Sequence, residues 1–105
     1  MIKSYKTTEE LTEIFKEATT AMADTFRRKN HDYGNSFFES LDKRGLVAAL
    51  VRMEDKMNRL DSLSKQEAMV ADENLIDTLL DLANYSIMTS MWLGNRVHTI
   101  KKGEA

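Results

Sequence analysis

The chain has no cysteine and no proline, and only four of its 105 residues are glycine. Without cysteine it has no disulfide, no thiolate metal site and no cysteine nucleophile. Without proline, and with so few glycines, helices can run for many residues without interruption. The chain also lacks an apolar run approaching the roughly 18 residues of a membrane span. These absences predict a helical protein without a membrane segment, and we expect it in the cytoplasm.

An excess of positive charge is missing too. Lysine and arginine number 15 against 17 aspartate and glutamate residues, for a net charge of −2. This balance argues against a dedicated nucleic-acid binder, because such proteins usually carry a basic excess. Apolar residues make up 42% of the chain, which is typical of a globular protein. The length predicts one domain over 1–105, with its core at about 8–93 and a basic C-terminal tail at 96–105.

Hydrophobic periodicity predicts helices along most of the chain. The first begins at a capping box formed by Thr7 and Glu10 and closes at the basic residues 27–29. Its apolar positions recur at helical spacing and predict one buried face, at Leu11, Ile14, Phe15, Ala18, Met22 and Phe26.

Turn-forming residues predict a loop at 30–36, followed by a short helix at about 40–43 that stops near Gly45. A long helix is expected at about 46–63, a linker or weak helix at 64–71, and a last long helix at about 72–94. Strand patterns are weak throughout. The predicted fold is therefore all-α, an antiparallel bundle of three long helices plus a short helix.

The last helix has no lysine or arginine between residues 74 and 93, and apolar side chains cover most of its circumference, which predicts a buried helix. Yet Glu73, Asp77 and Asp81 lie on one side of it; we call these three residues the acidic stripe. Asn84 and Tyr85 lie close by. Neighbouring carboxylates on a buried helix need a compensating cation, a basic partner or a metal such as Mg²⁺.

The preceding helix offers that partner. Arg52, Lys56 and Arg59 share one face; we call them the basic stripe. Such a stripe can neutralise carboxylates, hold phosphate oxygens, or do both. Two simpler explanations stay open. The acidic stripe is the solvent face of a surface helix, or Asp77 and Asp81 pair with Arg52 and Arg59.

The turn between the first two predicted helices is a third candidate element. Backbone amides near Gly34 could approach a ligand closely, Lys29 could meet a phosphate, and Tyr33 or Phe37 could stack on a base. The simpler explanation is a helix-to-helix turn in which the phenylalanines belong to the core.

Three segments taken together resemble a known family. They are KNHDYGNSF from residue 29, RMEDKMNRL from residue 52 and DENLIDTLLDLANY from residue 72. Over about residues 8–93 the chain resembles the phage and bacterial family called nucleotide modification associated domain 1. Its architecture is also similar to that of the MazG-like all-α nucleoside triphosphate pyrophosphohydrolases. That resemblance implies Mg²⁺, cleavage of a nucleoside triphosphate to monophosphate and pyrophosphate, a homo-oligomer (dimer or tetramer), and the host cytoplasm if the protein is phage-encoded.

The resemblance also implies roles for particular residues. Catalytic roles fall to the acidic stripe, Glu73, Asp77 and Asp81, and metal ligation to Glu54, Asp55, Glu73 and Asp77. Phosphate or nucleotide binding falls to Lys29, Asp32, Tyr33, Gly34, Phe37, Arg52, Lys56, Arg59, Asn84 and Tyr85. The chain departs from the MazG-like pattern on its third predicted helix, because Met57 follows Glu54 and Asn58 follows Asp55 where an ExxE pair would place a second carboxylate.

This departure leaves three hypotheses. The first is a Mg²⁺-dependent pyrophosphohydrolase. The second is a non-catalytic phage nucleotide-binding protein, a sponge that sequesters nucleotides or nucleotide-derived signals. The third is a helical interaction protein with no ligand, in which the basic stripe simply neutralises the acidic one.

Overall fold

A computed structural model describes residues 6–33, 35–66 and 68–101, and their side chains except those of residues 32–33, 68–71 and 96–101. The described residues form four helices and no strand: α1 (Thr8–Tyr33), α2 (Ser36–Arg44), α3 (Leu46–Leu63) and α4 (Ala68–Lys101). The all-α prediction is confirmed. The chain divides into two compact units, Met1–Gly34 and Asn35–Ala105. A single domain over 1–105 and a bundle that includes α1 stay predictions.

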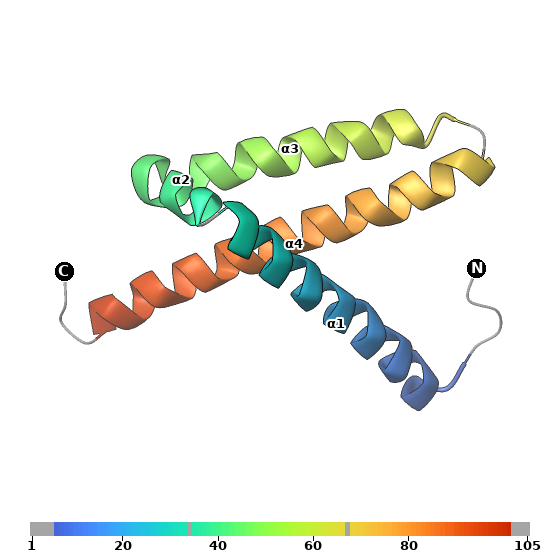
Figure 1. The fold of residues 1–105 in the computed structure, drawn as a ribbon, viewed down its shortest axis with the longest axis horizontal. Coiled ribbons are helices and arrows are strands. Elements are labelled where there is room, and N and C mark those ends of the chain that lie inside the picture. Colours follow the sequence, from blue (N-terminus) through green and yellow to red (C-terminus); the bar gives the residue numbers. More distant parts are fainter. Residues whose placement is uncertain (1–5, 34, 67, 102–105) are drawn as a thin grey trace. The chain divides into compact units, whose positions relative to one another are not determined.

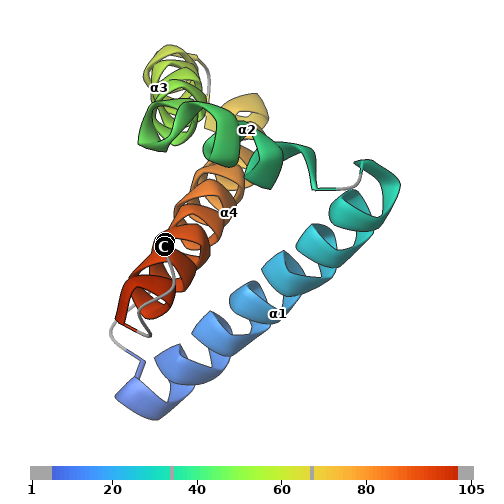
Figure 2. The same cartoon turned by 90° about the vertical axis from the view of Figure 1, so that its left-hand side faces the viewer.

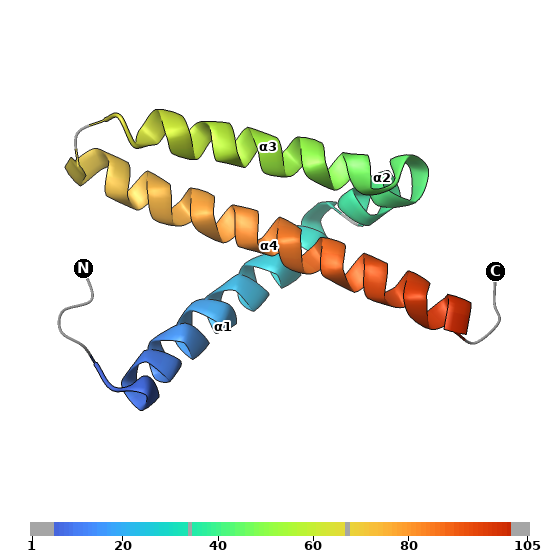
Figure 3. The same ribbon diagram turned by 180° about the vertical axis from the view of Figure 1, so that it is seen from behind.

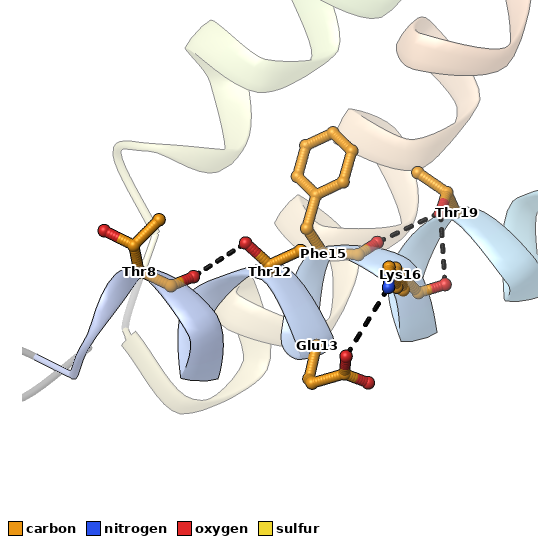
Figure 4. Close-up of polar contacts among 6 residues, drawn as sticks. All are labelled: Thr8, Thr12, Glu13, Phe15, Lys16 and Thr19. Carbon is orange, nitrogen blue, oxygen red and sulfur yellow. Dashed lines mark hydrogen bonds and ion pairs between the residues drawn. The ribbon is translucent and has the colours of Figure 1, made fainter.

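The first unit is built on α1, whose start follows the predicted capping box. The Glu10 amide donates to Thr7 Oγ1 at 3.2 Å, and the Thr7 amide donates to Glu10 Oε1 at 3.0 Å. Within the helix, the hydroxyls of Thr12 and Thr19 donate to carbonyl oxygens of the preceding turn (Figure 4). Two amides at the helix start, those of Thr7 and Glu10, therefore find partners within the capping box.

The end of α1 differs from the prediction. The helix continues through residues 30–33, where a loop was expected, and ends only at Tyr33. Asparagine and aspartate are weak helix formers, but neither interrupts a helix as proline does. The composition of this segment therefore predicted a turn where the helix in fact continues.

In the second unit, α3 and α4 run antiparallel side by side (Figure 1). The two helices diverge toward the C-terminal end of α4, and α2 lies at that end and contacts both of them (Figures 2 and 3). Leu41 of α2 is fully buried. The indole Nε1 of Trp92 on α4 donates to Asp42 Oδ1 on α2 at 2.9 Å. Both contacts fix α2 against the longer helices.

Gly45 separates α2 from α3. Its φ of 71° lies in the left-handed region, and its amide donates to the Leu41 carbonyl at 2.7 Å, which closes the end of α2. Glycine takes this conformation without the cost that a Cβ adds. The predicted stop near Gly45 is confirmed, although α2 begins at Ser36 rather than at about residue 40.

The bounds of α3 match the predicted 46–63, whereas α4 is longer at both ends than the predicted 72–94. Gly94 lies inside α4. One glycine costs about 1 kcal/mol in a helix interior, which does not end a helix with good formers on both sides. No helix in the described segments carries an apolar stretch long enough to cross a membrane.

Burial departs most from expectation. On α3 the buried residues are Ala49 and Leu63, and among the described residues of α4 they are two threonines, Thr78 and Thr89. Their hydroxyls donate to the carbonyls four residues earlier, so the buried oxygens are satisfied. Large apolar residues expected to be buried are instead exposed, at Leu11, Ile14 and Phe15 of α1 and Ile76, Leu79, Ile87 and Met91 of α4. Two helices bury only the stripes that face each other, so the rest of an apolar circumference stays uncovered.

We predict that Thr7→Ala weakens the start of α1. Loss of the hydroxyl acceptor should cost about 1 kcal/mol, seen as hydrogen exchange at the Glu10 amide that is faster by about fivefold. The matched control is Thr12→Ala, which removes a hydroxyl that only donates within the helix. An equal acceleration in both variants would contradict the capping role.

Candidate functional site

The polar contact between the two long helices is an ion pair. Lys56 Nζ on α3 lies 3.2 Å from Asp81 Oδ2 on α4, and their side chains are 27% and 33% exposed. The partners stand 25 residues apart in sequence, so the pair forms only when α3 and α4 pack. Partial burial makes each charge depend on the other more than it would in water.

Lys56 is the central member of the basic stripe. Arg52 precedes it by one helical turn and Arg59 follows it by three residues, so all three share a face of α3. Both arginines are exposed, and within the described residues neither makes an ion pair. One of the explanations left open, in which Asp77 and Asp81 pair with Arg52 and Arg59, is not seen among the described residues, where Asp81 pairs with Lys56.

The acidic stripe divides in the same way. Asp81 faces Lys56, whereas Asp77 and Glu73, one and two turns earlier on α4, are exposed. Because α3 and α4 run antiparallel, Arg59, which follows Lys56, and Asp77, which precedes Asp81, lie toward the same end of the pair, and Arg52 lies toward the other end. This edge of the α3–α4 pair therefore carries a basic residue on α3 and an acidic residue on α4 at the ion pair, and again toward its Arg59 end.

An aromatic contact lies next along α4. Tyr85 follows Asp81 by four residues, which is about 6 Å along the helix axis, and its ring meets Phe37 of α2 edge-on with centroids 5.0 Å apart. Phe38 also contacts Phe37, with the two rings tilted and 6.2 Å apart. Both phenylalanines and Tyr85 are half-buried, so part of each ring remains open to a partner. Asn84 beside Tyr85 is half-buried as well.

The remaining predicted residues do not gather here. Glu54 and Asp55 are exposed on α3. Among the described side chains, no group of three or more histidine, aspartate or glutamate residues is arranged to hold a metal ion. The four residues expected to bind Mg²⁺ therefore do not form a ready ligand set within the described part of one chain.

Of the residues predicted at the turn between the first two helices, Phe37 lies in the second unit, whereas Lys29, Asp32, Tyr33 and Gly34 belong to the first. Lys29 is exposed on α1. The side chains of Asp32 and Tyr33, and Gly34, lie outside the described residues. Their nucleotide-binding roles stay predictions.

Two residues of the second unit have structural roles that sequence reasoning missed. Asp42 accepts the Trp92 hydrogen bond, and Thr78 is buried at 2% exposure. For Asp42 the sequence holds no signal, because its partner is 50 residues away. For Thr78 a signal exists: it lies three residues before Asp81 and seven before Tyr85, and all three share one side of α4.

We predict that Lys56→Met lowers the free energy of unfolding by about 1–2 kcal/mol, because the half-buried Asp81 carboxylate loses its cation. Methionine keeps the apolar stem of the lysine. The matched control is Lys65→Met, which breaks the exposed pair with Asp61 (73% and 72% exposed) and should cost less than about 0.5 kcal/mol. Chemical denaturation measures both values, and equal losses would contradict a special role for Lys56.

Comparison with known protein families gives a match for the part of the chain that contains this edge. Residues 29–93, more than half of the chain, match the sequence profile of the family described as nucleotide modification associated domain 1. The matched span includes all of α2 and α3 and, on α4, Asp81, Tyr85 and Trp92, whose contacts with them are described above. No curated protein and no solved structure matches the chain, so the likeness to MazG-like enzymes stays a prediction. The chain belongs to the nucleotide modification associated domain 1 family.

Proposed function

We propose that the protein binds a nucleotide by its phosphates at the edge of the α3–α4 pair that carries the basic stripe. The observation that carries this proposal is the Lys56–Asp81 ion pair, which holds a half-buried ammonium group between two exposed arginines. The association of this family with nucleotide modification supports a nucleotide as the ligand. Arginine binds phosphate oxygens in bidentate fashion and lysine as a point charge, so the stripe combines both modes.

The length of the stripe suits more than one phosphate. Arg52 and Arg59 are seven residues apart, which places them about 10 Å apart along α3. Three cations over this length match a diphosphate or triphosphate better than a single phosphate. The protein carries a net charge of −2, so it has no general attraction for anions, and recognition has to come from this local stripe.

The aromatic contact gives the ligand a direction. Since α3 and α4 are antiparallel, Arg52 lies toward the level of Tyr85 and Phe37, whereas Arg59 lies toward Asp77. A base on the half-buried Phe37 ring would leave its phosphates running from Arg52 past Lys56 toward Arg59. Stacking on an aromatic ring contributes about 1–3 kcal/mol per base.

Capture without turnover is the function that this geometry favours. On α3 the stripe facing the acidic residues is basic, and Lys56 occupies the carboxylate of Asp81. The positions that would complete an ExxE pair hold Met57 and Asn58. The protein would then act as a sponge that sequesters a nucleotide or a nucleotide-derived signal.

Hydrolysis to monophosphate and pyrophosphate is the second candidate. Exposed Glu73 and Asp77 favour it, since both carboxylates lie on the same side of α4 as Asp81 and are open to solvent. Mg²⁺ would need further ligands, because the described residues of one chain form no set of three. Those ligands would come from the nucleotide phosphates, from water or from another chain.

One incubation separates the two candidates. The protein is mixed with a pool of nucleoside mono-, di- and triphosphates and Mg²⁺, then passed through a desalting column, and the bound and free fractions are analysed by mass spectrometry. We expect an unchanged nucleotide in the protein fraction at a stoichiometric amount, and about a tenfold loss of retention in Lys56→Met.

The control for this experiment is Lys65→Met, which removes an equal charge from an exposed pair outside the site. It should retain the nucleotide like the wild type. Pyrophosphate and monophosphate appearing in the free fraction would establish hydrolysis instead. A protein fraction with no nucleotide, from a pool that stays intact, would contradict both candidates and favour a helical interaction protein.

We also propose that the protein self-associates. Ile76, Leu79, Ile87 and Met91 lie on one side of α4 and are each about half exposed, and Leu46, Leu50 and Met57 of α3 are similarly exposed. Large apolar side chains that gather on one exposed face commonly mark an interaction surface. A second copy would supply an identical apolar face, since dimers with twofold symmetry use the same patch on both subunits.

We predict that Ile87→Glu shifts the protein toward a smaller assembly, because a charge on this face has to be desolvated when two copies meet. Light scattering coupled to size exclusion should give the wild type a mass that is a multiple of 12.1 kDa. The control, Ser62→Glu, adds the same charge at an exposed serine of α3 on a different side of the helix from Leu46, Leu50 and Met57. A wild-type mass of one chain would contradict self-association.

A further inference from the structure

We infer that Asp81 competes with phosphate for Lys56. Its carboxylate pairs with the lysine and has to release it when a polyphosphate binds. This inference rests on the proposed phosphate site and adds a role for Asp81 that neither capture nor hydrolysis requires. In this role Asp81 limits affinity, whereas a residue that helps hold the ligand would increase it.

The geometry of the pair supports this role. Asp81 Oδ2 lies 3.2 Å from Lys56 Nζ, which is the position that a phosphate oxygen would take. The Lys56 side chain is 27% exposed, so it has limited room for a second partner beside Asp81. An incoming phosphate either shares the lysine with a carboxylate of like charge or displaces that carboxylate.

The charges around the pair make sharing costly. Asp77 and Glu73 continue the acidic stripe beyond Asp81, and Asp55 lies among the basic residues on α3. A polyphosphate would meet carboxylates on both helices, and like charges at short range repel strongly where water is partly excluded. Freeing Lys56 from Asp81 therefore strengthens the site most directly.

Lys56 also has room to change partners. Its ammonium group is at the end of a flexible four-carbon stem. Arg52 and Arg59, before and after it on the same face of α3, are exposed. A ligand can contact the arginines first and then draw Lys56 away from Asp81. The competition thus sets a threshold, so that an anion with several charges binds and one with a single charge does not.

The experiment compares Asp81→Asn with the wild type by calorimetric titration of inorganic tripolyphosphate in EDTA. This probe needs no base contact and no metal. Asparagine keeps the size of the side chain and removes its charge, so we expect binding that is tighter by about 3- to 10-fold. In the double variant with Lys56→Met the gain should disappear, because no ammonium group is left to be freed.

The matched control is Asp61→Asn, which removes the same charge and also frees a lysine, Lys65, at an exposed pair outside the stripe. Its affinity should stay within twofold of the wild type. A gain in Asp61→Asn equal to that in Asp81→Asn would overturn the inference, since net charge alone would then explain it.

The other outcomes separate the two proposals. Measurable binding by the wild type with equal or weaker binding by Asp81→Asn would overturn the competitor role and leave the phosphate site standing. No binding by any of these proteins would overturn the phosphate site, and the competitor role with it. Circular dichroism verifies that the variants fold. If Asp81→Asn does not fold, carbon NMR of the wild type decides: the Asp81 carboxylate signal should move as tripolyphosphate is added, and a stationary signal would overturn the inference.

Discussion

The ion pair between Lys56 and Asp81 is the constraint around which the second unit is organised. It places one positive and one negative group, each about one third exposed or less, across the contact of two antiparallel helices. Each charge is stabilised by the other at this partly buried position, where hydration is reduced. A phosphate that binds Lys56 has to replace this contact, so packing and recognition depend on one ion pair.

The short helix α2 keeps that contact in place. α3 and α4 diverge toward the C-terminal end of α4 (Figure 1), and α2 lies at their wider end with Leu41 buried and Asp42 hydrogen-bonded to Trp92. Gly45 allows the chain to leave α2 and enter α3 at once, since its backbone adopts a positive φ. The same helix brings Phe37 to Tyr85, one turn from Asp81. The nine residues of α2 therefore both hold α3 and α4 at this end and supply the aromatic part of the proposed site.

Local signals in the sequence predicted the parts of this fold that depend on neighbouring residues. The capping box at Thr7 and Glu10 and the bounds of α3 follow from chemistry within a few positions. The extension of α1 through residues 30–33 was missed because turn-forming residues also tolerate helix.

The basic and acidic stripes were predicted to meet, but periodicity alone does not tell which members do so. The choice of Lys56 over the arginines depends on how α3 and α4 pack, and helical spacing puts all three residues on the same face. The exposed side of α4 was likewise missed, because an apolar sequence does not say how many partners cover it.

A structure of the protein with a nucleoside triphosphate bound tests the central claim most directly. The account predicts phosphate oxygens within hydrogen-bond distance of Lys56 Nζ, flanked by Arg52 and Arg59, with the base against Phe37 and with Asp81 no longer paired to the lysine. Phosphates held elsewhere on the molecule, with the Lys56–Asp81 pair still closed, would contradict it.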